Sequence, residues 1–273
     1  MKNNTFYKFV IALIASVCMG TAMADCQELP SHSELQLALN SVVGAGNSGL
    51  ANDMWATLVD KDGRVCAVAF SGANRSGQWL GSRVISAQKA NTANAFSLPA
   101  GSNGLVPGLA LSTANLWAAV QPGGSLFGLQ HSNPVDTATA YGNSSHSGGS
   151  GRRYGQHNDP MVGHFIGGVN VFGGGLALYN AYGDRVGGLG LSGDTSCSDH
   201  IQAWKVQDAL ELDNVPAGVA AGTDNIIFDI SDDMGGNPES TSGFGHPTCG
   251  VADTDEETIA ADLPITHPIG PNP

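Results

Sequence analysis

Apolar residues repeat with the spacing of an α-helix in three segments of the chain. The segments are 32–43, 82–96 and about 199–210. Side chains that can cap a helix stand at each start: Ser31, in a capping-box pattern with Glu34, then Ser82, then Ser196 or Ser198. The pattern therefore predicts three helices, each with an apolar face toward a core.

Shorter apolar runs between these helices predict strands. Two runs, 55–59 and 65–70, flank the turn Lys61-Asp62-Gly63 and predict a β-hairpin. Later runs that predict strands are 168–172, 176–179 and 185–192, with a further edge strand at 226–228. The element order predicts an α+β fold, with a single antiparallel sheet of about five strands flanked by helices.

The periodicity is lost between residues 97 and 166. Five prolines interrupt this segment, and Gly, Ser and Asn fill 143–151. One helix near 109–120 is expected inside it. Because long loops in compact domains usually carry a function, we interpret 97–166 as a loop-rich insertion that acts as a lid or an oligomer contact.

The first 24 residues have the pattern of a signal peptide. Lys2 and Lys8 precede the short apolar run 9–19, and Ala22-Met23-Ala24 fits a cleavage site. The run is too short to remain as a membrane-spanning helix. We expect a periplasmic or secreted protein without a stable membrane anchor. Its main domain would be 25–212, followed by an acidic tail, 213–273, rich in Pro and Gly.

Charge and composition exclude some partners. The chain has 11 basic and 24 acidic residues and a net charge of −13, which becomes −15 once the predicted leader is removed. Nucleic acid is not expected as a partner, because binding to phosphates needs clustered cations. Only 13% of the residues are charged and 38 are Gly, so many loops are expected.

Four cysteines follow the predicted leader, and an even number in an oxidising compartment predicts two disulfides. Three pairings are possible. We favour Cys26–Cys66 and Cys197–Cys249, since the second would tie the tail to the body of the domain. No C-x-x-C or C-x-x-C-H motif occurs, so the usual signals of zinc, thioredoxin and covalent haem sites are missing.

Other motifs with known chemistry are weak. Residues 44–49 match G-x-G-x-x-G, but they follow a helix instead of a strand, so the dinucleotide-binding context is absent. Asp229, Asp232 and Asp233 lack the spacing of a calcium-binding loop. The acidic run 253–257 is interpreted as a solvated charge cluster.

Two segments, 55–96 and 167–210, resemble the GlcG/HbpS haem-binding family, in its exported, cysteine-containing branch. The shared features are the V-D-x-D-G hairpin, S-x-x-K-A-x-T-A at 86–93, a Gly-Gly pair before a strand, and G-x-S-G-D before the last helix. The resemblance implies a compact α+β domain that forms homo-oligomers. It also implies non-covalent haem binding for sensing, storage or degradation. A cobalamin-type tetrapyrrole is the alternative, because the fold is similar to an accessory domain of some corrinoid adenosyltransferases.

A haem site needs an apolar slot, an axial donor and partners for the propionates. His200 is the first candidate as haem iron ligand, because it lies at the start of a helix after a strand-to-helix turn; His131 and His164 are the other candidate donors. The candidate propionate partners are Arg83, Lys89 and Arg185. Aromatic residues that can line the slot are Trp79, Trp117, Phe127, Phe165 and Phe172.

The leading interpretation is an exported protein that binds a small-molecule tetrapyrrole. One alternative is a structural or oligomeric interaction module without a cofactor. The other is a periplasmic enzyme that acts on a small organic acid or on haem. No catalytic residue is predicted, because the sequence reveals no nucleophile–base pair.

Overall fold

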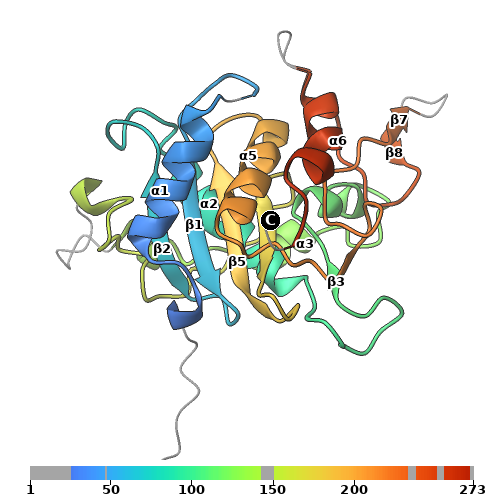
Figure 1. Cartoon of the computed structure of the whole chain (residues 1–273), viewed down its shortest axis with the longest axis horizontal. Coiled ribbons are helices and arrows are strands. Elements are labelled where there is room, and N and C mark those ends of the chain that lie inside the picture. Colours follow the sequence, from blue (N-terminus) through green and yellow to red (C-terminus); the bar gives the residue numbers. More distant parts are fainter. Residues whose placement is uncertain (1–25, 47, 143–150, 233–237, 251–254, 271–273) are drawn as a thin grey trace, which may run out of the picture.

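A four-stranded antiparallel sheet lies at the centre of the protein (Figure 1). The structure is a computed structural model that describes residues 26–46, 48–142, 151–232, 238–250 and 255–270. The strand order is β2-β1-β5-β4. The strands are β1 (Trp55–Asp60), β2 (Val65–Phe70), β4 (Gly175–Tyr179) and β5 (Arg185–Ser192).

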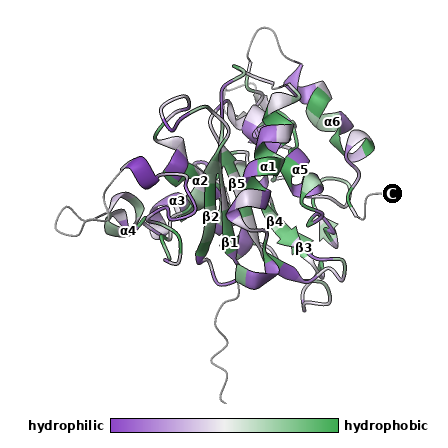
Figure 2. Ribbon diagram, turned by 60° about the vertical axis from the view of Figure 1, so that its left-hand side comes forward, coloured by the Kyte–Doolittle hydropathy of each residue, from purple (hydrophilic) through white to green (hydrophobic). Residues whose placement is uncertain are grey.

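Helices cover both faces of this sheet. On one face lie α1 (His32–Gly44) and α5 (Ser196–Ala209), and on the other lies α2 (Ser82–Ala95). The strands are apolar along nearly their whole length (Figure 2), as expected when both faces of a sheet are buried. The sequence prediction of an α+β fold with one antiparallel sheet flanked by helices is confirmed, with four strands instead of about five.

Helix α2 packs unusually close to β5 because glycines replace side chains at the contact. A Cβ atom on Gly188 would lie 2.3 Å from the carbonyl oxygen of Ala90, and one on Gly190 would lie 1.9 Å from that of Ser86. Both distances are far below contact, so the two backbones can meet only with glycine here. This close packing of α2 on β5 determines how deeply the polar side chains of α2 are buried.

The remaining elements are short and lie in the loop-rich segments. They are β3 (Leu109–Ala110), which pairs with β6 (Ala217–Gly218), β7 (Ile230–Asp232), which pairs with β8 (Pro238–Ser240), the helices α3 (Leu129–Ser132), α4 (Thr137–Tyr141) and α6 (Glu256–Thr266), and the 3₁₀ helices at Cys26–Glu28, Ala114–Leu116, Ala118–Val120 and Gly151–Arg153. Residues 143–150, within the predicted insertion, lie outside the described ranges.

Several predicted elements are wrong in position or type. The expected strands at 168–172 and 226–228 are loops, and 109–120 holds a two-residue strand and two 3₁₀ helices instead of one α-helix. At 168–172 the reason is local: Gly168 has φ +87°, and the N–H of Asn170 bonds to the Thr92 hydroxyl instead of a neighbouring strand.

The helix caps also differ from the predictions. Gly81 takes the N-cap position of α2, so Ser82 is already helical. Thr195 caps α5, and its hydroxyl accepts the N–H of Ser198. The acidic run near 255 is not simply a solvated cluster, since Asp255 caps α6 and Glu256 is 1% exposed.

Both favoured disulfides are present. Cys26 bonds to Cys66, with a Cα–Cα distance of 5.6 Å, and Cys197 bonds to Cys249, with a Cα–Cα distance of 6.1 Å. The first joins the start of the described chain to β2, and the second joins α5 to the C-terminal segment. No helix among the described residues is long and apolar enough to cross a membrane. The predicted signal peptide, 1–24, lies outside those residues.

Candidate functional site

Two buried ion pairs extend from α2. Arg83 and Lys89 are each at most 1% exposed, although charged side chains are seldom fully buried. Arg83 pairs with Asp159, and Lys89 pairs with Asp199. These are the salt bridges found in the described ranges, and each one organises a different polar centre.

The Lys89–Asp199 pair lies between α2, β5 and the start of α5. The ammonium group of Lys89 donates to Asp199 Oδ2 over 2.6 Å and to the carbonyl of Leu191 over 3.0 Å. Asp199 Oδ1 accepts the N–H groups of Gly193 and Asp194, at 3.0 and 2.9 Å. Burial raises the pKa of Asp199 to about 6 and lowers the pKa of Lys89. The pair therefore fixes the turn that leads from β5 into α5.

His200 lies next to this pair and is completely buried. Its Nε2 accepts the N–H of Ile226 over 3.0 Å and lies 3.1 Å from the side-chain oxygen of Asn225. Its Nδ1 has no hydrogen-bond partner among the described residues. Burial lowers the pKa of His200 to about 3, so the ring is neutral at physiological pH.

A second imidazole closes the same centre from the C-terminal segment. His246 is 1% exposed, its Nδ1 donates to the carbonyl of Pro247 over 2.7 Å, and burial lowers its pKa to about 4. Trp117 packs against it, with ring centroids 6.3 Å apart. The ring of Phe172 lies 4.6 Å from the Lys89 ammonium. We call this group, Lys89, Asp199, His200 and His246, the sealed centre.

The Arg83–Asp159 pair organises the loop-rich side of α2. Arg83 Nε donates to Asp159 Oδ2 over 2.8 Å, and a second guanidinium nitrogen bonds to Oδ1. Arg83 Nη1 donates to the carbonyl of Ala140 over 2.6 Å, and the guanidinium lies 3.9 Å from the ring centroid of Tyr154. Asp159 also accepts the N–H groups of Gly155 and Met161. One buried ion pair thus ties α4 to residues 154–161.

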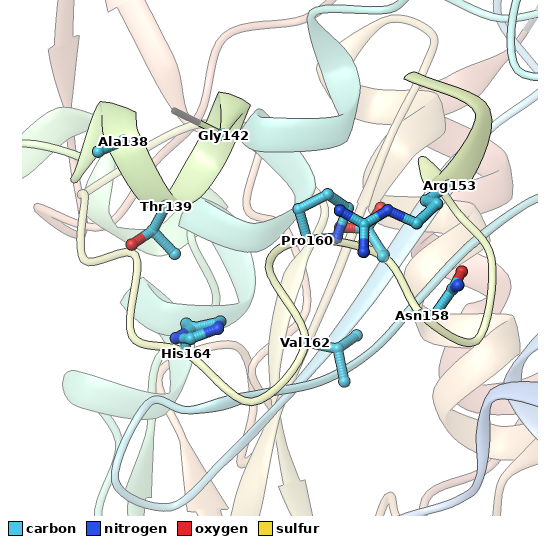
Figure 3. A pocket seen from close by; sticks show the side chains of 9 residues that line it. Ala138, Thr139, Gly142, Arg153, Asn158, Pro160, Val162 and His164 are labelled. Atoms are coloured by element: carbon cyan, nitrogen blue, oxygen red, sulfur yellow. The ribbon is translucent and has the colours of Figure 1, made fainter. Parts of the chain in front are cut away.

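A pocket of about 500 Å³ opens beside this pair, and Asp159 forms part of its wall. Figure 3 shows His164 and Thr139 on one side of the pocket and Arg153 and Asn158 on the other. The lining residues are Ala138, Thr139, Gly142, Arg153, Asn158, Asp159, Pro160, Val162 and His164. We call this the His164 pocket.

The backbone around His164 is fixed while its side chain stays exposed. The carbonyl of His164 accepts the N–H of Val65 over 2.9 Å, and the N–H of Gly163 bonds to the carbonyl of Val65 over 2.8 Å. These bonds extend the edge of β2. A firmly held backbone presents an imidazole to the pocket at little entropic cost on binding.

The six residues predicted to bind a ligand do not come together. His200 and Lys89 lie in the sealed centre. His164 lines the open pocket, with Arg83 behind its wall. His131 is exposed on α3, and Arg185 Nη1 donates to Asn94 and to the carbonyl of Lys61. Their roles toward a ligand stay predictions. Of the expected aromatic residues, Trp117 and Phe172 lie at the sealed centre, and the other three are exposed and do not line the pocket.

Sequence reasoning missed two residues that shape the pocket. Asp159 anchors Arg83 across 76 positions of sequence, which no local pattern reveals. Arg153 lines the pocket, and Arg152 precedes it in the sequence without lining the pocket. In a chain with only 11 basic residues, this adjacent pair of arginines was a usable signal for a site that takes an anion.

Comparisons with known proteins give likenesses in fold. No family model and no curated protein matches the chain. Among solved structures, the Klebsiella pneumoniae protein ORFY, assigned to DUF336, is 20% identical, with a TM-score of 0.41 over 65% of this chain and 86% of its own. A PduOC:heme complex is 22% identical, with a TM-score of 0.42 over 66% of this chain and 91% of its own. The heme belongs to that complex.

Proposed function

We propose that the protein binds a haem, or another flat tetrapyrrole, non-covalently in the His164 pocket. The observation that carries the proposal is the exposed imidazole of His164, held on a fixed backbone across an open pocket from Arg153. A pocket of about 500 Å³ is within the usual range for small-molecule sites. Export before binding is part of the proposal, and the two disulfides support it.

The side chains of this pocket fit the chemical demands of such a ligand. His164 is the residue that would bind the iron, since a neutral imidazole is a common axial donor. Arg153 would pair with a propionate, because a guanidinium matches the geometry of a carboxylate. Val162, Pro160 and Ala138 supply apolar contact. A bound haem would supply redox-active iron; the protein side chains supply binding and orientation.

The sealed centre fits the ligand less well than the pocket. His200 is fully buried, and its Nε2 already accepts a backbone N–H. The cations of Lys89 and Arg83 are bound to carboxylates, so neither charge is available to a propionate without losing a buried pair. His200 as the iron ligand would require the C-terminal segment to move away.

A hemin titration followed by absorbance tests the proposal. The wild-type chain, purified after export, should give a Soret band at one haem per chain. His164→Ala should abolish it, and the matched exposed variant His131→Ala should retain it. His200→Asn distinguishes the two centres, because it should leave the band unchanged.

Two results would contradict the proposal. If His164→Ala binds hemin as the wild type does, the iron ligand lies elsewhere. If the wild type shows no band with hemin and no spectral change with cobalamin, the protein is a module without this cofactor. Light scattering on the same samples tests the expected homo-oligomer.

A further inference from the structure

The disulfide between Cys26 and Cys66 has a buried carboxylate beside it. The two Sγ atoms and a carboxylate oxygen of Asp60 all lie within 4.8 Å of one another. Asp60 is the last residue of β1 and is 1% exposed, whereas both cysteines are half-buried. None of these three residues belongs to the sealed centre or lines the His164 pocket.

One oxygen of the Asp60 carboxylate is held by the fold, and the other has no partner. Asp60 Oδ1 accepts the N–H groups of Asp62 and Arg64, at 3.0 and 2.9 Å, in the turn between β1 and β2. Asp60 Oδ2 is buried without a hydrogen-bond partner among the described residues. The Arg64 guanidinium bonds instead to the carbonyl of Gly163 and lies over the ring of Phe165. An unpaired oxygen of this kind is costly, since buried polar groups are nearly always hydrogen-bonded.

The second disulfide also has a carboxylate nearby, but that carboxylate already has a partner. A carboxylate oxygen of Glu256 lies within the same range of the sulfurs of Cys197 and Cys249, and Glu256 Oε1 accepts the hydroxyl of Thr195 over 2.6 Å. Cys249 Sγ accepts the N–H of Cys197 over 3.1 Å, and Cys197 is fully buried. An ion that entered there would displace existing hydrogen bonds, whereas Asp60 Oδ2 has none to lose.

A metal ion binds cysteine sulfurs as thiolates, so the first group can act as a metal site only when its disulfide is open. Cysteines enter every new chain as thiols, and a dithiol reductant restores that state. One thiolate of the reductant attacks the S–S bond, and its second thiolate resolves the mixed disulfide. The reductant leaves as a disulfide, and Cys26 and Cys66 each gain one electron and one proton.

The reduced group matches the ligand preferences of zinc. Zinc binds cysteine sulfur at about 2.3 Å and carboxylate oxygen at about 2.0–2.2 Å in a tetrahedral arrangement. In that arrangement two thiolates lie about 3.8 Å apart, and a thiolate and a carboxylate oxygen lie about 3.6 Å apart. Both separations fall inside the range that joins the three side chains here. Thiolates are soft ligands, which favours zinc over calcium or magnesium.

We propose that Cys26 and Cys66, once reduced, bind one zinc ion together with Asp60. Zinc displaces the two thiol protons and takes two thiolates and one carboxylate oxygen, with water in the fourth position. The ion holds the 3₁₀ helix Cys26–Glu28 against the β1–β2 hairpin while the disulfide is absent. This site is independent of the tetrapyrrole proposal, since the two sites share no residue.

Cobalt tests the site directly, because cobalt bound to thiolates absorbs light through sulfur-to-metal charge transfer. The full chain is reduced with dithiothreitol, freed of it without air, and titrated with cobalt. The absorption should saturate at one cobalt per chain, with the intensity of two thiolates, and zinc should remove it. The oxidised chain should show no such absorption.

Variants assign the ion to one of the two disulfides. Cys26→Ser combined with Cys66→Ser should lose the cobalt absorption, and Cys197→Ser combined with Cys249→Ser should keep it. Asp60→Asn keeps an oxygen for the turn and should lower the zinc affinity roughly tenfold or more. Asp62→Asn removes an exposed carboxylate of the same turn and is the matched control.

Thermal unfolding gives a second readout on the wild-type chain. Zinc at a hundred times its dissociation constant should raise Tm of the reduced chain by roughly 5–10 °C. Tm of the oxidised chain should stay unchanged under the same conditions. An equal rise in both forms would place the ion away from the cysteines and overturn the proposal.

Three further results would overturn it. The reduced wild type shows no cobalt–thiolate absorption, or the absorption depends on Cys197 and Cys249, or Asp60→Asn binds zinc as tightly as Asp62→Asn. The last comparison decides even if reduction unfolds the chain, because thiols of an unfolded chain bind metal without regard to which of these two carboxylates is present.

Discussion

The two ion pairs of α2 have the same chemistry and opposite surroundings. Arg83 and Lys89 lie six residues apart on one helix, about 9 Å along its axis. Lys89 meets Asp199 between β5 and the start of α5, where the C-terminal segment covers the pair, whereas Arg83 meets Asp159 beside an open pocket. Burying a cation therefore does not by itself make a binding site. What covers the pair decides whether a ligand can approach.

The covering segments differ in how they are fixed. The sealed centre is closed by His246, in a segment that Cys249 bonds covalently to Cys197 of α5. The pocket is bordered by residues 138–142 and 153–164, whose anchors are hydrogen bonds to Arg83, Asp159 and Val65. The disulfide holds the covering segment over the sealed centre, which suits a structural role. The residues around the His164 pocket are held only by hydrogen bonds and leave the pocket open to solvent.

The largest expected effect is the loss of one partner in the sealed centre. Lys89→Ala leaves Asp199 as an uncompensated buried charge, which should lower the free energy of unfolding by roughly 3–5 kcal/mol. Urea denaturation followed by tryptophan fluorescence measures it. Lys61→Ala, in the exposed turn between β1 and β2, is the control and should change little. A loss below about 1 kcal/mol for Lys89→Ala would show that water already reaches the centre.

Removing one partner of the ion pair beside the pocket should lower the free energy of unfolding by a smaller amount. Asp159→Asn keeps an acceptor for Gly155 or Met161 but removes the charge opposite Arg83. Because water can enter from the pocket, the expected loss is roughly 2–3 kcal/mol in the same denaturation experiment. Asn158→Ala, exposed in the same pocket, is the control. A cost equal to that of Lys89→Ala would remove the distinction between the sealed and the open pair.

The fold could be predicted where the signal is local. The capping box at Ser31 and the Asp-Gly turn before β2 lie within a few residues of the elements they define, so α1 and the hairpin were correctly placed. The predicted strand at 168–172 failed because glycines with positive φ override an apolar pattern. The prediction that the acidic run near Glu256 is solvated was wrong, because the burial of Glu256 depends on a distant contact. That contact is a hydrogen bond from the hydroxyl of Thr195.

The site was harder to predict because its decisive contacts span long stretches of sequence. Nothing near His200 indicates that residues 225–226 and 246 cover it. The residue types were reasonable candidates, yet accessibility is a property of the packed chain. His164 and Arg153 line the same pocket because residues 151–164 fold back beside the edge of β2.

The sealed centre should also make the stability of the protein depend on pH. The pKa of His200 falls from 6.5 to about 3 on folding, so the unfolded chain binds a proton that the folded chain refuses. Stability from this group is complete above pH 6.5 and is lost as pH falls toward 3. At pH 5 the loss is about 2 kcal/mol.

Comparing His200→Asn with the wild type at pH 7 and pH 5 isolates this effect. The variant should lack the part of the acid destabilisation that His200 causes, whereas His131→Asn should keep all of it. Equal acid sensitivity in the wild type and His200→Asn would mean that the imidazole is solvated, and the description of this centre as sealed would then be wrong.

The smallest effect on stability should come from the residue most important to the proposed ligand. His164 bonds to its neighbours through its backbone, and its side chain is exposed in the pocket, so His164→Ala should change the free energy of unfolding by at most about 0.5 kcal/mol. The same denaturation series measures it, with His157→Ala as an equally exposed control. A loss above about 1 kcal/mol would show that the imidazole packs as part of the fold. Loss of hemin binding without loss of stability is the combination that separates a ligand-binding residue from a structural one, and the Lys89 and His200 variants should show the reverse.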